Sequence, residues 1–125
     1  LPQYDMMAVF EAVTNAVAHR DYSMAGSKIR LRMFDDRLEI YSPGMLPNTM
    51  TPDSLAYRQA SRNETVTSLL ACCPVKGDWT HRSHIMDKRG EGVSLILSRS
   101  EQFSGRKPEY RLIDDSELLL SIYAA

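Results

Sequence analysis

The chain has 125 residues, of which 43% are hydrophobic and 25% are charged, so its composition is that of an ordinary globular domain with one core. Fifteen Lys and Arg against sixteen Asp and Glu give a formal net charge of -1, which excludes a strong overall attraction to nucleic acid or to an anionic membrane. Apolar runs such as Leu118-Leu119-Leu120 are far shorter than the roughly 18 to 20 residues that span a bilayer. We therefore expect a single domain over residues 1–125 and no membrane partner.

The N-terminus and the cysteines indicate the setting of the domain. The sequence begins Leu1-Pro2-Gln3, without Met and without the pattern of a signal peptide, so we expect a fragment of a longer chain. Cys72 and Cys73 are adjacent, which disfavours an ordinary disulfide and departs from the usual spacing of zinc ligands. We expect buried thiols and a reducing, cytoplasmic location.

The first half of the chain predicts a helix and a hairpin. A helix is expected from Met6 to about His19, with Asp5 as its cap, because apolar residues recur there at three-and-four spacing. Strict alternation over 28–33 and again over 37–41, across a short acidic turn, predicts two antiparallel strands. The residues expected on the buried face of this hairpin are Ile29, Leu31, Met33, Leu38 and Ile40.

The second half predicts short helices and a closing hairpin. A Pro- and Gly-rich loop over 42–48 precedes a helix start near 51–57 and a short helix over 63–71, which Asn63 is expected to cap. A polar, irregular stretch follows, then a helix over 92–100 and strands over 109–113 and 118–123. This order predicts an α+β two-layer sandwich, with a mixed, mostly antiparallel sheet covered by helices on one face.

Three polar residues share one face of the first helix. Glu11, Asn15 and His19 are spaced four apart and therefore lie along one line. A solvated helix face is the simpler interpretation, but Asn and His are poor helix formers and are unusual choices for such a face. A carboxylate one turn from an amide suits metal-assisted phosphoryl chemistry, in which the amide oxygen ligates Mg²⁺ and the carboxylate orients a water molecule.

The segment His19-Arg20-Asp21 is also similar to the catalytic loop of protein kinases. That interpretation fails, because Gly26 stands where a kinase has Asn five residues after the Asp, and no Gly-rich loop precedes it.

Four motifs together resemble the C-terminal ATPase-like domain of RecG-related helicases and transcriptional regulators, a branch of the GHKL (Bergerat-fold) superfamily. The resemblance covers about Tyr4 to Tyr123. In chain order the motifs are Glu11-x-x-x-Asn15-Ala16-x-x-His19-Arg20-Asp21-Tyr22, the stretch from Phe34 to Pro47, Ser61-Arg62-Asn63, and Arg89-Gly90-Glu91-Gly92-Val93. Their order makes the resemblance more specific than any one motif would.

The resemblance implies a role for each site residue. Glu11 would be the general base and Asn15 would hold Mg²⁺, and His19 on the same helix face is counted with the nucleotide-binding residues. The loop with Ser42, Gly44 and Met45 would contact adenine. The second loop, with Arg89, Gly90 and Gly92, would wrap the phosphates. A physical argument supports this role of the glycines, because they leave backbone N–H groups free at a helix N-terminus, where anions are favoured.

Two residues of the adenine loop depart from the wider GHKL pattern. Ser42 stands where most members have an Asp that accepts from the adenine amino group, and Met45 replaces a Gly. A hydroxyl can accept a hydrogen bond but carries no charge.

Two main functions therefore remain open. The first is a domain that binds ATP with Mg²⁺, either with or without hydrolysing it. The second is a degenerate regulatory or assembly module of a DNA-binding transcription regulator, without ATPase activity. Direct nucleic-acid binding by Lys28, Arg30 and Arg32 is a weaker third option, beside a solvated or interface role for that face. All three functions are compatible with DNA contact through other domains of a longer protein. The sequence is also compatible with assembly of the protein into a homo-oligomer.

Overall fold

The structure, a computed structural model, describes residues 2–44, 63–75, 84–85, 92–114 and 116–125. These residues form seven elements, which agree in kind and order with the sequence-based expectation. In chain order they are α1 (Met6–His19), β1 (Arg30–Met33), β2 (Arg37–Pro43), α2 (Glu64–Cys72), α3 (Gly92–Ser104), β3 (Glu109–Ile113) and β4 (Glu117–Tyr123).

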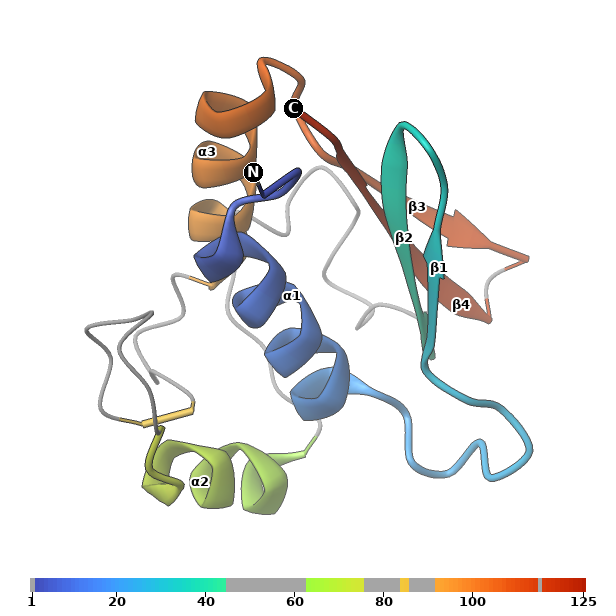
Figure 1. Ribbon diagram of the computed structural model, residues 1–125. Coiled ribbons are helices and arrows are strands. Elements are labelled where there is room, and N and C mark those ends of the chain that lie inside the picture. The colour runs from blue at the N-terminus through green and yellow to red at the C-terminus, as the bar shows by residue number, and fades with distance from the viewer. Residues whose placement is uncertain (1, 45–62, 76–83, 86–91, 115) are drawn as a thin grey trace.

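The four strands form one sheet in the order β1-β2-β4-β3, and every described pairing is antiparallel. The two predicted hairpins, β1-β2 and β3-β4, are joined through the long-range β2-β4 pair at the centre of the sheet. Helices α1 and α3 lie on one face of the sheet and pack against each other, whereas α2 lies beyond the C-terminal end of α1 (Figure 1). The predicted α+β architecture, with helices covering one face, is confirmed.

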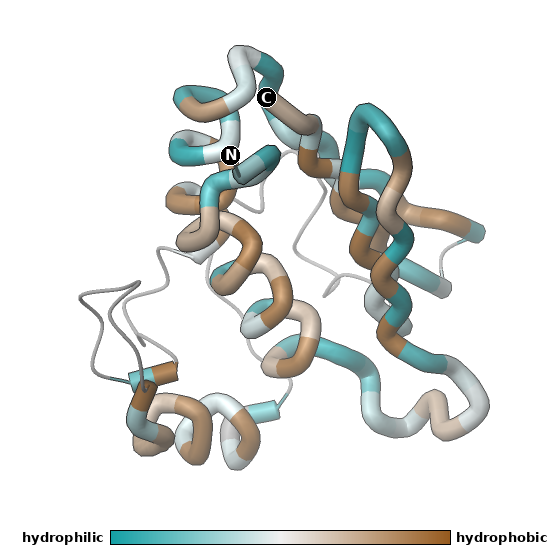
Figure 2. Tube along the Cα trace, in the orientation of Figure 1, coloured by the Kyte–Doolittle hydropathy of each residue, from teal (hydrophilic) through white to brown (hydrophobic). Residues whose placement is uncertain are grey.

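The core lies between this helix layer and the sheet. Apolar positions alternate with polar ones along the strands, and α1 is apolar over most of its length (Figure 2). The buried residues that form the main cluster are Tyr4, Ala12, Ala16, Leu38, Ile40, Ile96, Leu120 and Ile122. Small alanine side chains on α1 allow the helix to approach its neighbours closely. Val9 and Val13 of the same helix pack against the core and are only partly buried.

The predicted burial of Leu31 and Met33 is wrong. The register of the hairpin is as expected, with Leu31 opposite Ile40 and Met33 opposite Leu38. However, Leu31 is 55% exposed and Met33 is 71% exposed. The reason is that α1 packs on β2 and α3 packs on β4, so the helix layer covers the central strands while β1 forms the edge of the sheet.

Other boundaries also differ from the expectation. Ser42 and Pro43 continue strand β2 and do not belong to a loop, and α3 extends to Ser104. Both cysteines, Cys72 and Cys73, are free and exposed where buried thiols were expected. The predicted helix near 51–57 and most of the irregular stretch after Pro74 lie outside the described residues. In the described parts of the chain, no helix combines the length and apolarity needed to cross a bilayer.

The N-terminus of α1 is fixed by Asp5, as predicted. The Asp5 carboxylate accepts a hydrogen bond from the Ala8 backbone N–H at 2.9 Å, which satisfies one of the free donors of the first turn. It also receives two bonds from the Arg99 guanidinium of α3, at 2.8 and 2.9 Å. Asp5 therefore both caps α1 and ties it to α3.

This double role predicts a pH-dependent contribution to stability. The side-chain hydrogen bond from Arg99 is the main cause that lowers the pKa of Asp5. A carboxyl whose pKa is lowered by folding stabilises the protein above its unfolded-state value, near 3.9, and loses that contribution as the pH falls through the lower folded-state value. We expect Asp5→Asn, which keeps a capping oxygen, to lower the free energy of unfolding by about 0.5–1 kcal/mol at pH 7.

Urea unfolding of both proteins between about pH 2 and pH 7 measures this effect. The two stability curves should converge at the acidic end, and Asp5→Ala, which also removes the cap, should cost about 1 kcal/mol more at pH 7. A difference between wild type and Asp5→Asn that stays constant over the whole pH range would contradict the assignment.

Candidate functional site

Three of the predicted site residues meet where α1 passes the start of α3. Gly92 is the first residue of α3 and lies directly against the side chains of Glu11 and Asn15. A Cβ atom placed on Gly92 would lie 2.6 Å from Asn15 Nδ2 and 2.9 Å from Glu11 Oε2. Only glycine fits this contact without displacing a neighbour, so the close approach of the two helices depends on it.

The chemistry of this meeting point is set by the two α1 side chains. Glu11 is only 4% exposed, and its carboxylate lies at the N-terminal end of α3, where the helix dipole favours negative charge. The Asn15 Nδ2 group donates to the Glu11 backbone carbonyl at 2.9 Å. This bond fixes the plane of the amide through its nitrogen, and the amide oxygen is the atom that suits a hard cation.

The other predicted site residues are separated from this point. Ser42, on β2, donates from its hydroxyl to the Ala16 carbonyl at 3.3 Å, so it contacts α1 on the side that faces the sheet. Gly44 is buried after the end of β2, has φ 125°, and donates its backbone N–H to the Ser116 carbonyl at 2.7 Å. His19 is the last residue of α1, two turns beyond Glu11. Met45, Arg89 and Gly90 lie outside the described residues.

The C-terminal end of α1 is held by side chains that the sequence did not assign to it. The Asn63 amide donates to the Ala18 carbonyl at 2.9 Å and to the Arg20 carbonyl at 2.6 Å, and the Tyr22 hydroxyl donates to the Val17 carbonyl. Asn63 does stand at the N-cap position of α2, but its side chain makes no capping bond to that helix. The predicted capping of its own helix is therefore wrong, because the amide caps the end of α1.

The loop after α1 is organised by Arg20. Its guanidinium donates to the backbone carbonyls of Asp21, Met24 and Ser27, and it lies 5.0 Å from the centre of the Tyr22 ring. The Asp21 backbone N–H in turn donates to the Pro43 carbonyl at 2.9 Å, which links the loop to the end of β2. The segment that is similar to a kinase catalytic loop thus contains a residue that shapes the backbone.

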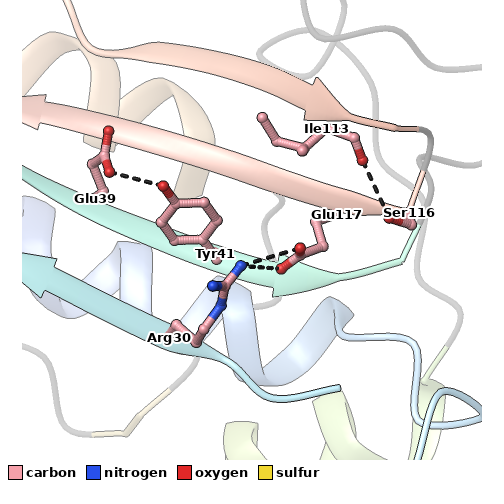
Figure 3. Close-up of polar contacts among 6 residues, drawn as sticks. All are labelled: Arg30, Glu39, Tyr41, Ile113, Ser116 and Glu117. Carbon is pink, nitrogen blue, oxygen red and sulfur yellow. Dashed lines mark hydrogen bonds and ion pairs between the residues drawn. The ribbon is translucent and has the colours of Figure 1, made fainter. Parts of the chain in front are cut away.

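The basic row considered for nucleic-acid contact lies on the sheet face away from the helices. There Arg30 makes two hydrogen bonds with the Glu117 carboxylate, at 2.9 and 3.1 Å (Figure 3). The guanidinium carbons of Arg30 and Arg32 lie 4.4 and 5.4 Å from the centre of the Tyr41 ring. The Tyr41 hydroxyl donates to Glu39 at 2.9 Å. The charge of Arg30 is therefore balanced within the sheet, while Lys28 lies ahead of β1.

A metal site built only from protein ligands is not found in the described residues, where no group of three His, Cys, Asp or Glu side chains gathers. A cation held mainly by a bound ligand and one amide oxygen would need no such group of side chains.

The fold of this chain is also found in a protein of known structure. The chain is similar to the crystal structure of the DIP2311 protein from Corynebacterium diphtheriae, with a TM-score of 0.82 and 24% sequence identity. The match covers 99% of this chain and 24% of that one, so the chain spans about a quarter of the length of this relative. At this level of identity the likeness concerns the fold. A comparison with curated proteins finds no match.

The chain also matches a protein family over most of its length. The family described as "Putative ATP-dependent DNA helicase recG C-terminal" matches residues 26–121, which is well over half of the chain and includes Ser42, Gly44 and the Gly90–Gly92 motif. The matched range begins after α1 and therefore does not include Glu11 and Asn15. On the extent of this match, the chain belongs to the family of RecG C-terminal, ATPase-like domains.

Proposed function

We propose that this domain binds ATP together with Mg²⁺ at the meeting point of α1 and α3. The observation that carries the proposal is the contact of Gly92, at the N-terminus of α3, with the side chains of Glu11 and Asn15. A helix N-terminus that begins on glycine offers backbone donors to a phosphate. The description of the family, which refers to an ATP-dependent protein, supports the same ligand.

The residues present fit a Mg-nucleotide. A Cβ on Gly92 would clash with Asn15 and Glu11, so the glycine lets both polar side chains lie directly against the N-terminus of α3. The Asn15 amide is oriented by its bond to the Glu11 carbonyl, and its oxygen would be the protein ligand of the cation. Bound Mg²⁺ would neutralise phosphate charge.

If the domain also hydrolyses ATP, Glu11 would be the general base. Its carboxylate lies within the same contact as Asn15 and is almost fully buried. A carboxylate in that position can orient a water molecule and accept its proton. Hydrolysis would require the full set of Glu11, Asn15 and the glycine contact, whereas binding alone would not require Glu11.

A second candidate is a module that keeps the fold and regulates or assembles a DNA-binding protein without ATP turnover. The observation that favours it is the position of Ser42, whose hydroxyl hydrogen is directed to the Ala16 carbonyl. No carboxylate stands at this position to accept from an adenine amino group, so selection of adenine would be weaker than with Asp.

Calorimetry with ATP and ADP, with and without Mg²⁺, tests the proposal. We expect Asn15→Ala to weaken Mg-nucleotide binding by about tenfold, or about 1.4 kcal/mol, and to remove most of its Mg²⁺ dependence. Glu11→Gln should retain binding and lose any turnover of ATP. Ser98→Ala, an exposed position on α3, is the matched control and should change neither. If the wild type releases no binding heat with ATP or ADP, the nucleotide proposal is rejected and the second candidate stands.

A further inference from the structure

The candidate site depends on where α1 sits along its own axis. Asn15 and Glu11 are both on α1, while Gly92 starts α3, and their closest approach leaves no room for one extra carbon atom. A shift of α1 by a fraction of its 1.5 Å rise per residue would therefore separate Asn15 from the start of α3 or press it against that helix. Besides the packing of α1 on α3 and β2, contacts at the two ends of α1 help to hold it in this position.

The two ends are fixed differently. At the N-terminal end, Asp5 binds Arg99 of α3. At the C-terminal end, Asn63 bridges two carbonyls, those of Ala18 and Arg20, at 2.9 and 2.6 Å. Ala18 lies three residues after Asn15, so it is on the next turn of the same rigid helix. Asn63 is at the start of α2, and its bonds join that helix to α1.

We propose that Asn63 is a positioning residue for the nucleotide site: by holding the last turn of α1 against the start of α2, its amide fixes Asn15 relative to Gly92. This rests on the proposed function for the ligand, whereas the positioning itself is a property of the protein alone. Asn63 touches neither Gly92 nor Asn15 in the contacts described, and it acts through the α1 backbone.

The chemistry of the contact offers a sharp variant. An Asn side chain supplies two N–H donors from one nitrogen, which suits two carbonyls at once. Asp has nearly the same shape but no donor when ionised, and it would place a negative charge at the negative end of the α1 dipole. Asn63→Asp should therefore break both bonds, and Asn63→Ala removes them without adding charge.

The control removes a different bond from the same turn. Tyr22→Phe deletes the hydroxyl that donates to the Val17 carbonyl, but Tyr22 belongs to the loop that follows α1 and not to α2. If simple fraying of the helix end were the cause, Tyr22→Phe and Asn63→Ala would act alike. If the link to α2 is the cause, only the Asn63 variants should affect the site.

The first measurement is made without any nucleotide. Proton–nitrogen NMR spectra should show that Asn63→Asp and Asn63→Ala shift the side-chain amide signal of Asn15 and the backbone amide signal of Gly92. Tyr22→Phe should leave both signals in place. Unchanged Asn15 and Gly92 signals in a folded Asn63→Ala protein would overturn the proposal.

The second measurement is the dissociation constant for ADP with Mg²⁺, taken well below the unfolding midpoint of each variant. We expect it to rise about tenfold in both Asn63 variants and less than about twofold in Tyr22→Phe. Equal affinities of wild type and folded Asn63→Ala would overturn the proposal. If the wild type itself binds no nucleotide, the proposed function fails, and the NMR signals alone decide whether Asn63 positions Asn15.

Discussion

Replacing Gly92 by valine should abolish nucleotide binding, with a dissociation constant raised about 100-fold or more, which corresponds to about 2.7 kcal/mol. The physical reason is steric. A first side-chain carbon on Gly92 would already lie 2.6 Å from Asn15 Nδ2 and 2.9 Å from Glu11 Oε2, and valine adds two methyl groups to it. Both polar side chains must move, and the space beside the start of α3 is filled.

The same substitution should lower the free energy of unfolding by about 1–3 kcal/mol, because the contact between α1 and α3 becomes overpacked. Calorimetry with ADP and Mg²⁺ and urea unfolding measure the two effects separately. Gly92→Ala should be intermediate, since it adds only the first carbon.

Gly26→Ala is the matched control for these variants. A Cβ placed on Gly26 would have no heavy atom within 4 Å, so alanine there should leave nucleotide affinity unchanged and alter stability by no more than about 0.5 kcal/mol. Gly92→Val with wild-type affinity for Mg-ADP would show that the phosphates do not lie at the start of α3.

Local patterns explain why much of the fold could be predicted. The spacing of apolar residues from Met6 to His19 and the capping Asp5 are properties of neighbouring residues, and the structure gives α1 those bounds and that cap. Alternation likewise predicted the β1-β2 hairpin. Both signals need no knowledge of distant parts of the chain.

Burial at the sheet edge could not be predicted in the same way. The alternation of Leu31 and Met33 is as regular as that of Leu38 and Ile40, yet only the second pair is covered by α1. Which strand lies at the edge is decided by the β2-β4 pairing, and that pairing joins segments far apart in the sequence. Hydropathy alternation tells the two faces of a strand apart but does not tell an edge strand from a central one.

The candidate site shows the same division. Helical spacing alone placed Glu11 and Asn15 on one line, but their contact with Gly92 depends on how α1 and α3 pack. The sequence shows the motif with Asn63, but the contact that Asn63 makes, with the end of α1, is a long-range bond from a side chain to the backbone. Sequence pattern carries no information on such a bond, because any Asn before a helix also looks like a local cap.

Arg20 belongs to the motif at the end of α1, but its contacts hold the backbone of the following loop. Its guanidinium joins three carbonyls of one loop, those of Asp21, Met24 and Ser27. Each hydrogen bond from a charged group contributes about 1.5–3 kcal/mol before the cost of ordering the side chain. We expect Arg20→Ala to lower the free energy of unfolding by about 3 kcal/mol in urea unfolding experiments.

The form of the side chain should matter more than its charge. Arg20→Lys should cost nearly as much as Arg20→Ala, because an ammonium group is compact and cannot span carbonyls that the planar guanidinium reaches from two nitrogens. Arg106→Ala is the matched control: Arg106 also stacks on a tyrosine, 3.7 Å from the centre of the Tyr123 ring, but its side chain is exposed and no side-chain hydrogen bond of it is found among the described residues. That variant should cost less than about 1 kcal/mol. If Arg20→Lys were as stable as wild type, a positive charge at the end of α1 would be enough to explain the contribution of Arg20 to stability. The hydrogen bonds to the three carbonyls would then contribute little.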